Sequence, residues 1–179
     1  MKKKIENREQ KIENRKMKKL IFLFFTFLTA FGYSQPKNIN SLIGQDYSIL
    51  GNEVVFEDYS IKNIGGYLLP KDGFDADFGI AEFWSSEKRF LLFFRIDDSK
   101  QIITNVLEID KKDLQNKKTT EYCSTKNGFD SEIIAIVKDS DSEFYTEIVK
   151  AWKANRKTGK FEKVSKRKIK KCGNESYGI

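Results

Sequence analysis

The chain of 179 residues contains no histidine, and this absence limits the chemistry that it can perform. Catalysis by Ser-His-Asp or Cys-His groups is excluded, as are zinc and non-haem iron sites that use imidazole ligands. A pair of carboxylates, as in glycoside hydrolysis, remains possible because it needs only two Asp or Glu at a suitable separation. The sequence does not indicate which two would act together, so we assign no catalytic residue and expect no cofactor.

Two acidic clusters are the candidates for a cation site. They are Asp72, Asp75 and Asp77 in one expected loop, and Asp139, Asp141 and Glu143 in another. Calcium takes about six to eight oxygen ligands, and its characteristic loop has an internal glycine and ends in a distal bidentate Glu. Neither cluster has that spacing. We therefore interpret both as solvated turns and assign no metal ligand.

Positive charge is concentrated near the C-terminus. Residues 150–171 hold eleven Lys or Arg and one Glu, whereas residues 35–149 hold 13 basic and 21 acidic residues. The densest part surrounds Ile169 and consists of Lys166, Arg167, Lys168, Lys170 and Lys171. These side chains would attract an acidic protein or an anionic component of a cell envelope. The alternative is that they protect an edge strand from self-pairing and are attracted to the acidic remainder of the chain.

Residues 17–34 have the three parts of a secretory signal peptide. Lys18 and Lys19 precede an apolar core at residues 20–31, and small residues follow at Gly32 and Ser34. This core of twelve residues is shorter than the roughly twenty that cross a bilayer as a helix, although an uncleaved anchor is the alternative. We expect translation to start at Met17, with residues 1–16 as a leader of doubtful status. Cleavage near Ser34–Gln35 would then leave residues 35–179 as one exported domain.

Export changes the expected charge and partners of the chain. The whole chain has a net charge of +7, but the first 34 residues carry nine Lys or Arg and three Glu. The remainder holds 24 basic and 23 acidic residues, a net charge of +1. We therefore expect no nucleic acid partner, and no transmembrane span in the exported domain.

The two cysteines, Cys123 and Cys172, both lie in the expected exported domain. An even pair in an oxidising compartment favours a disulfide, and the Cys-x-x-Cys spacing of redox-active dithiols is absent. We predict a structural bridge that fastens the C-terminal segment to the middle of the domain.

Short β-rich runs separated by polar turns dominate from residue 78 onward. Residues 78–84, 89–96 and 101–109 predict a three-stranded meander, and the apolar run at 90–94 predicts a central strand covered on both faces. Further strands are expected at 131–138, 143–154 and 161–165, with a hairpin at Gly159, whereas Gly65–Gly66 reads as a loop. Trp84 and Trp152 fall within strands and are interpreted as core residues.

The predicted fold class is mainly β, a single-domain antiparallel sheet forming a sandwich or a partly closed barrel, with α+β as the alternative. One or two short helices are expected, one capped by Asn40 or Ser41 and one by Asp110. The leading functional hypothesis is a small exported, non-catalytic binding or inhibitor-like protein that uses its basic C-terminal surface. The alternatives are a small hydrolase with paired carboxylates and a purely structural envelope protein.

Overall fold

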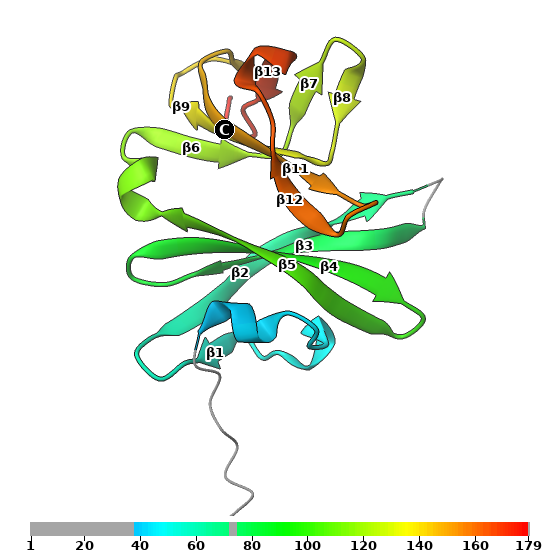
Figure 1. The fold of residues 1–179 in the computed structure, drawn as a ribbon. Helices are drawn as coiled ribbons and strands as arrows, with labels where there is room; N and C mark the ends of the chain where they lie inside the picture. Colours follow the sequence, from blue (N-terminus) through cyan, green and yellow to red (C-terminus); the bar gives the residue numbers. More distant parts are fainter. Residues whose placement is uncertain (1–37, 72–74, 179) are drawn as a thin grey trace, which may run out of the picture. The chain divides into compact units, whose positions relative to one another are not determined.

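The computed structural model describes residues 38–71 and 75–178. The predicted leader, signal peptide and cleavage site all lie outside these residues. Within them the fold is mainly β, with three antiparallel sheets, short 3-10 turns and no α-helix (Figure 1). No helical segment in this part of the chain has the length and apolar character needed to cross a membrane. The predicted fold class is confirmed.

The first sheet has five strands and curls into a half-barrel. Its strands follow the chain in the order β1 (Glu53–Val55), β2 (Ser60–Pro70), β3 (Ala76–Trp84), β4 (Lys88–Asp97) and β5 (Lys100–Asp110). Strands β3, β4 and β5 are the predicted meander, which is confirmed.

Strand β4 is covered on both faces, as its apolar run predicts. Phe90, Leu92 and Phe94 pack inside the half-barrel with residues such as Phe83. Leu91 and Phe93 point to the opposite face, where they contact a second sheet. Alternation of side chains along a strand requires this arrangement when every residue of the run is apolar.

The second sheet covers the outer face of the half-barrel. It has the order β12-β11-β9-β6, formed by β6 (Lys117–Thr120), β9 (Ile133–Lys138), β11 (Ile148–Asn155) and β12 (Lys160–Lys163). Trp152 is 8% exposed and packs with Ile134, Ile136 and Ala154 against the half-barrel, so its assignment to the core is confirmed. The same assignment is wrong for Trp84, which is 38% exposed at the end of β3.

The third sheet packs on the other face of the second. Its order is β10-β13-β7-β8, formed by β7 (Cys123–Thr125), β8 (Gly128–Asp130), β10 (Phe144–Tyr145) and β13 (Ile169–Gly173). Cys123 and Cys172 are direct partners on β7 and β13 and form a disulfide, which confirms the predicted bridge. Both are fully buried in a cluster with Ala135 and Val137.

The helical segments differ from the expected short helices. They are the 3-10 turns η1 (Ile39–Leu42), η2 (Tyr47–Ile49), η3 (Lys111–Leu114) and η4 (Lys166–Lys168). The side chain of Asn38, and not that of Asn40 or Ser41, caps η1. Asp110 precedes η3 as predicted, but its side chain makes no capping hydrogen bond.

The strand expected at residues 143–154 is divided in two. Phe144 and Tyr145 pair with β13 in the third sheet, whereas the chain from Ile148 onward pairs with β9 in the second. The two pairings are separated by Thr146 and Glu147, which lie outside both strands and carry the polypeptide from the third sheet to the second. The predicted hairpin follows, with Gly159 at φ 65°.

Candidate functional site

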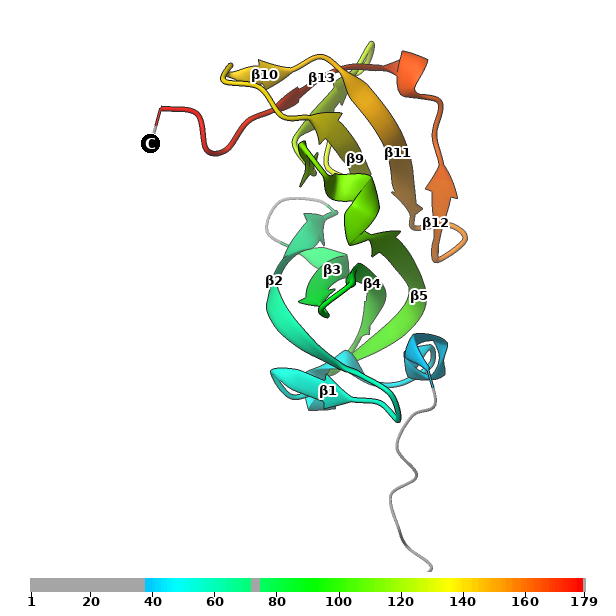
Figure 2. The same ribbon diagram turned by 90° about the vertical axis from the view of Figure 1, so that its left-hand side faces the viewer.

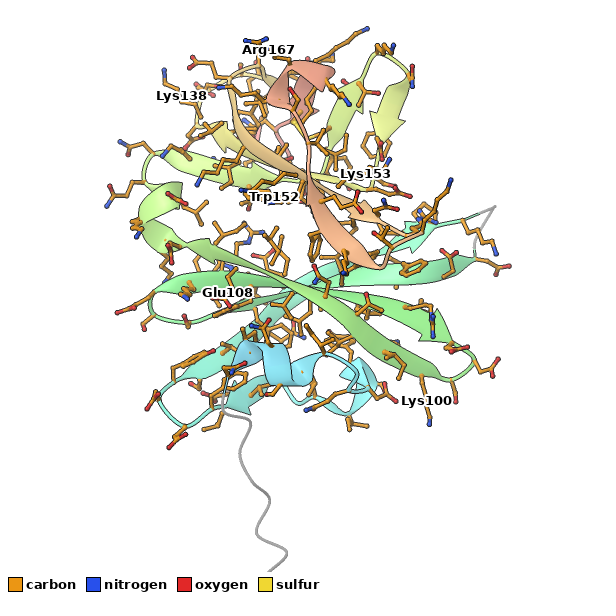
Figure 3. All side chains as sticks on the ribbon, in the orientation of Figure 1. Lys100, Glu108, Lys138, Trp152, Lys153 and Arg167 are labelled. Atoms are coloured by element: carbon orange, nitrogen blue, oxygen red, sulfur yellow. A yellow bond between two sulfur atoms is a disulfide. The ribbon has the colours of Figure 1, made fainter. Side chains whose placement is uncertain are left out.

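The five basic residues around Ile169 form one exposed surface, here called the basic surface. Lys166, Arg167 and Lys168 make up η4, and Lys170 and Lys171 lie on β13. All five are exposed. Ile169 is only 7% exposed and packs with the third cluster of core residues, so it fixes the segment while its neighbours face water. Figure 3 shows Arg167 at the top of the described fold and Lys100 near its bottom.

Three of the six basic residues at 150–163 pair with acidic residues from elsewhere in the fold, whereas Lys157, Lys160 and Lys163 are exposed and make no ion pair with the described residues. Lys150 Nζ lies 2.6 Å from Asp113 Oδ2. Lys153 Nζ lies 2.9 Å from Asp130 Oδ2, and Arg156 Nη1 lies 3.0 Å from Asp77 Oδ1. The predicted attraction to the acidic remainder of the chain therefore accounts for these three residues.

No residue of the basic surface makes an ion pair with any residue that the structure describes. One of its ammonium groups, Lys171 Nζ, lies 3.2 Å from the centroid of the Phe144 ring. The other four cationic side chains of the basic surface are exposed to solvent, where a partner can bind them.

The position of β13 is compatible with the alternative interpretation, in which the lysines protect an edge strand from pairing with another chain. This strand pairs with β7 on one side, but β10 covers only Cys172 and Gly173 on the other. The side next to Lys170 is therefore open among the described residues, and lysine at such a position discourages pairing with another chain. The two interpretations of these lysines do not exclude each other.

A hollow of about 240 Å³ adjoins the basic surface. It is lined by Lys150, Lys163 and Lys166 together with apolar residues that include Trp152. Lys166 belongs to both, so the basic surface adjoins a hollow that is lined by two further lysines.

The two acidic clusters do not form a cation site within the described residues. Asp72 lies outside them, and Asp77 is paired with Arg156. In the second cluster, Asp139 pairs with Lys118 at 3.1 Å. The described part of the chain holds no group of three or more Cys, Asp or Glu arranged to bind a metal ion.

A polar cavity between the half-barrel and the second sheet was not predicted from the sequence. This inter-sheet cavity has a volume of about 90 Å³ and is lined by β2, β3 and β4, together with Ile134 and Glu121. Its polar side chains are Tyr67, Glu82, Arg89 and Glu121. It therefore brings two carboxylates from distant parts of the chain to one place.

The charges in the inter-sheet cavity are unequally compensated. Glu82 forms an ion pair with Arg89 and also accepts a hydrogen bond from the indole N–H of Trp84, at 2.6 Å. Burial raises the pKa of the Glu121 carboxyl, and the negative charges of Glu175 and Glu82 raise it further. Glu82 and Arg89 neutralise each other, but ionised Glu121 makes no ion pair among the described residues.

The hydroxyl of Tyr67 is buried in this cavity without a hydrogen-bond partner in the described structure. The same is true of Nε of Arg89. Burial raises the pKa of Tyr67, so its hydroxyl stays protonated. Unpartnered buried polar atoms carry a cost of about 1–3 kcal/mol, which a ligand supplying the partners would relieve.

Two glycines within β2, and not in the loop expected from Gly65–Gly66, shape the cavity wall. Gly65 has φ 140° at a register shift in the strand. A Cβ on Gly66 would lie 2.4 Å from the carbonyl oxygen of Ile80. Consecutive glycines usually indicate a turn, but here they permit a bulge and a close approach of backbones.

Family models, curated proteins and solved structures give no match to this chain. The fold defines it as a small protein of three antiparallel sheets closed by one disulfide. Any functional assignment therefore depends on the exposed basic surface and the inter-sheet cavity.

Proposed function

We propose that this chain is a small exported, non-catalytic binding protein that attaches to an anionic polymer of a cell envelope through its basic surface. The observation that carries this proposal is the set of five exposed cations without an ion pair among the described residues, next to three basic residues that are paired. Folding pairs Lys150, Lys153 and Arg156 with carboxylates and leaves the basic surface, like the exposed lysines at 157, 160 and 163, without an ion pair among the described residues.

The composition of the surface favours a charged polymer over an acidic protein. Four of its five cations are lysines, which are compact, strongly hydrated point charges on flexible stems. Lysine is depleted from protein–protein interfaces, whose energetic centres are aromatic residues and arginine. A flexible polymer with repeated negative charges can meet mobile lysines one by one and needs no such centre.

The buried disulfide supports the part of the proposal that concerns export. Disulfides persist in oxidising compartments and are rare where thiols are kept reduced. The bridge between Cys123 and Cys172 agrees with the signal-like sequence at residues 17–34. It also joins β13, which carries two of the lysines, to the middle of the fold.

A hydrolase with paired carboxylates is the second candidate, because Glu82 and Glu121 line one cavity and the pKa of Glu121 is raised. It is less well supported than binding. Glu82 is already held by Arg89 and Trp84, and a cavity of about 90 Å³ is too small to enclose a scissile bond between two sugar rings. A purely structural envelope protein would bind neither a polymer nor a substrate.

Titration calorimetry with dextran sulfate as the anionic probe and uncharged dextran as its matched control tests the proposal. The triple variant Lys166→Ser/Arg167→Ser/Lys168→Ser is expected to bind dextran sulfate about tenfold more weakly, a loss of about 1.4 kcal/mol. Uncharged dextran should not bind.

The control variant removes the same charge elsewhere, at three exposed lysines: Lys62→Ser/Lys100→Ser/Lys126→Ser. Its affinity should stay within about threefold of the wild type, since the charges that it removes do not touch the polymer. If both triple variants weaken binding equally, net charge and not the basic surface drives the interaction, and the proposal is wrong.

A further inference from the structure

Among the described residues, the outer edge of β2 is open over most of its length. Strand β1 pairs only with Ser60–Lys62, and the last bond on that side runs from the backbone N–H of Asn63 to the carbonyl of Asn52. From residue 64 to residue 69 no described strand pairs with this edge. Figure 2 shows β2 along the margin of the lower half of the ribbon, with β1 beside its lower end only.

This edge lacks the charges that usually protect one. Residues 64–69 read Ile-Gly-Gly-Tyr-Leu-Leu, and Ile64 and Leu68 are 54% and 57% exposed. Soluble proteins place lysine, proline or inward charges on open edges, because unpaired backbone groups recruit other strands. Register shifts at Asn63/Gly65 and Leu69/Pro70 bound the open stretch and limit an added strand to about six residues.

The inter-sheet cavity lies beside the same stretch of β2. Ile64, Gly65, Gly66 and Tyr67 line it and also form the open edge. A strand added to the edge would therefore place some of its side chains next to the cavity. Backbone hydrogen bonds give affinity in strand addition, and pockets for individual side chains give specificity.

The charges of the cavity indicate which side chain would enter. The described residues that line it include two carboxylates, Glu82 and Glu121, and one cation, Arg89, which is paired with Glu82. Glu175 is close enough to raise the pKa of Glu121. A positive group is therefore favoured. An ammonium is compact enough for about 90 Å³ and can donate to Glu121 and to the unpartnered hydroxyl of Tyr67.

We propose that the open edge of β2 binds an extended peptide segment of another protein as an added strand, with one lysine side chain of that segment in the inter-sheet cavity. The Nε–H of Arg89 then gains an acceptor from a carbonyl or bridging water of the bound segment. A second copy of this chain fits less well, because its residues 64–69 contain no basic side chain to enter the cavity. The inference uses different residues from the basic surface and does not depend on the proposed function.

A phage library of random decapeptides, selected on the full protein, is the probe. We expect the recovered peptides to share a lysine at one position within a run of β-branched or aromatic residues. A synthetic peptide of the selected sequence should protect the amides of residues 64–69 from hydrogen exchange. Replacing its lysine by norleucine, which keeps the length and removes the charge, should weaken binding at least tenfold.

Two variants of the protein test the cavity without threatening the fold. Glu121→Gln keeps the shape of the side chain, and Tyr67→Phe removes a hydroxyl that bonds to nothing in the described structure. Glu121→Gln should weaken the selected peptide about tenfold and Tyr67→Phe a few-fold. Glu87→Gln, on the exposed turn between β3 and β4, is the matched control and should have no effect.

Several results would overturn the inference. These are recovered peptides without a shared lysine, affinity that is unchanged in both cavity variants, and exchange protection outside residues 64–69. Self-association that protects these amides without any peptide would identify a second copy as the occupant. Peptide binding lost only in the basic-surface triple variant would move the site to that surface.

Discussion

The disulfide between Cys123 and Cys172 gives a prediction with a magnitude that follows from the structure. The bridge closes a loop with a sequence separation of 49 residues. In the chain-entropy model, a loop of this length stabilises the folded state by about 4 kcal/mol at 25 °C. For a domain of this size each kcal/mol corresponds to roughly 2–4 °C in Tm, so the bridge is worth about 8–16 °C.

The test replaces both cysteines, as Cys123→Ala/Cys172→Ala, and measures unfolding by differential scanning calorimetry. The Tm of the wild type is also measured in a reductant that opens the bridge. This second measurement removes the bridge without changing any side chain. Lys126→Ala, at an exposed side chain just after β7, is the control and should change Tm by less than about 2 °C.

Hydrogen exchange locates the effect within the fold. The bridge joins direct partners on β7 and β13, so amides of these two strands should lose protection before those of β4. If Tm decreases by less than about 3 °C in both the double variant and the reduced protein, the reasoning is refuted. It would mean that packing alone holds β13 in the third sheet.

Two further predictions concern the core and the cavity. Phe93 is fully buried, with its ring centroid 5.0 Å from that of Phe78. Phe93→Ala should therefore lower the free energy of unfolding, measured in urea, by about 3–5 kcal/mol. The control is Phe129→Ala, at a side chain that is 62% exposed, which should lower it by under about 1 kcal/mol. Equal costs would contradict the packing of the two sheets. The folded-state pKa of Glu121 is raised above its unfolded value, so ionisation of this carboxyl opposes folding as the pH rises through that folded-state pKa. Glu121→Gln should therefore raise Tm at pH 7 and leave it unchanged at pH 3, where the carboxyl is protonated in both states; a lower Tm at pH 7 would show that ionised Glu121 is stabilising.

The predicted parts of the fold are those in which local pattern and tertiary contact agree. The run from Phe90 to Phe94 is apolar at every position, which only a strand buried on two faces accommodates, and β4 has two such faces. The cysteine pair also followed from few facts, because the chain has no other cysteine with which either could pair.

The division of the strand at residues 143–154 could not be predicted from alternation. The pattern continues through Thr146 and Glu147, although the chain changes sheets there. The sheet that a strand joins depends on pairing partners that are far away in sequence. The residues of the strand itself do not identify these partners. The length of the expected strand, twelve residues, was the only local warning.

The inter-sheet cavity depends on residues that come together only in the folded chain. Glu121 follows β6, whereas Glu82 lies on β3 and Tyr67 on β2. One signal was present in the sequence: Glu82 occupies the same strand face as Phe78 and Ile80, which pack against the second sheet. A charged residue on an apolar strand face indicates a polar partner or a site.

The salt dependence of binding to dextran sulfate tests the central claim, attachment through the basic surface, most directly. Binding by released counterions makes log K fall linearly with log salt, and each lost charge contact lowers the slope by about one. The account predicts a steep slope for the wild type. In Lys166→Ser/Arg167→Ser/Lys168→Ser the slope should be smaller by about two to three, and it should be unchanged in the control triple variant at Lys62, Lys100 and Lys126. A slope near zero, or one that is the same in all three proteins, would contradict it.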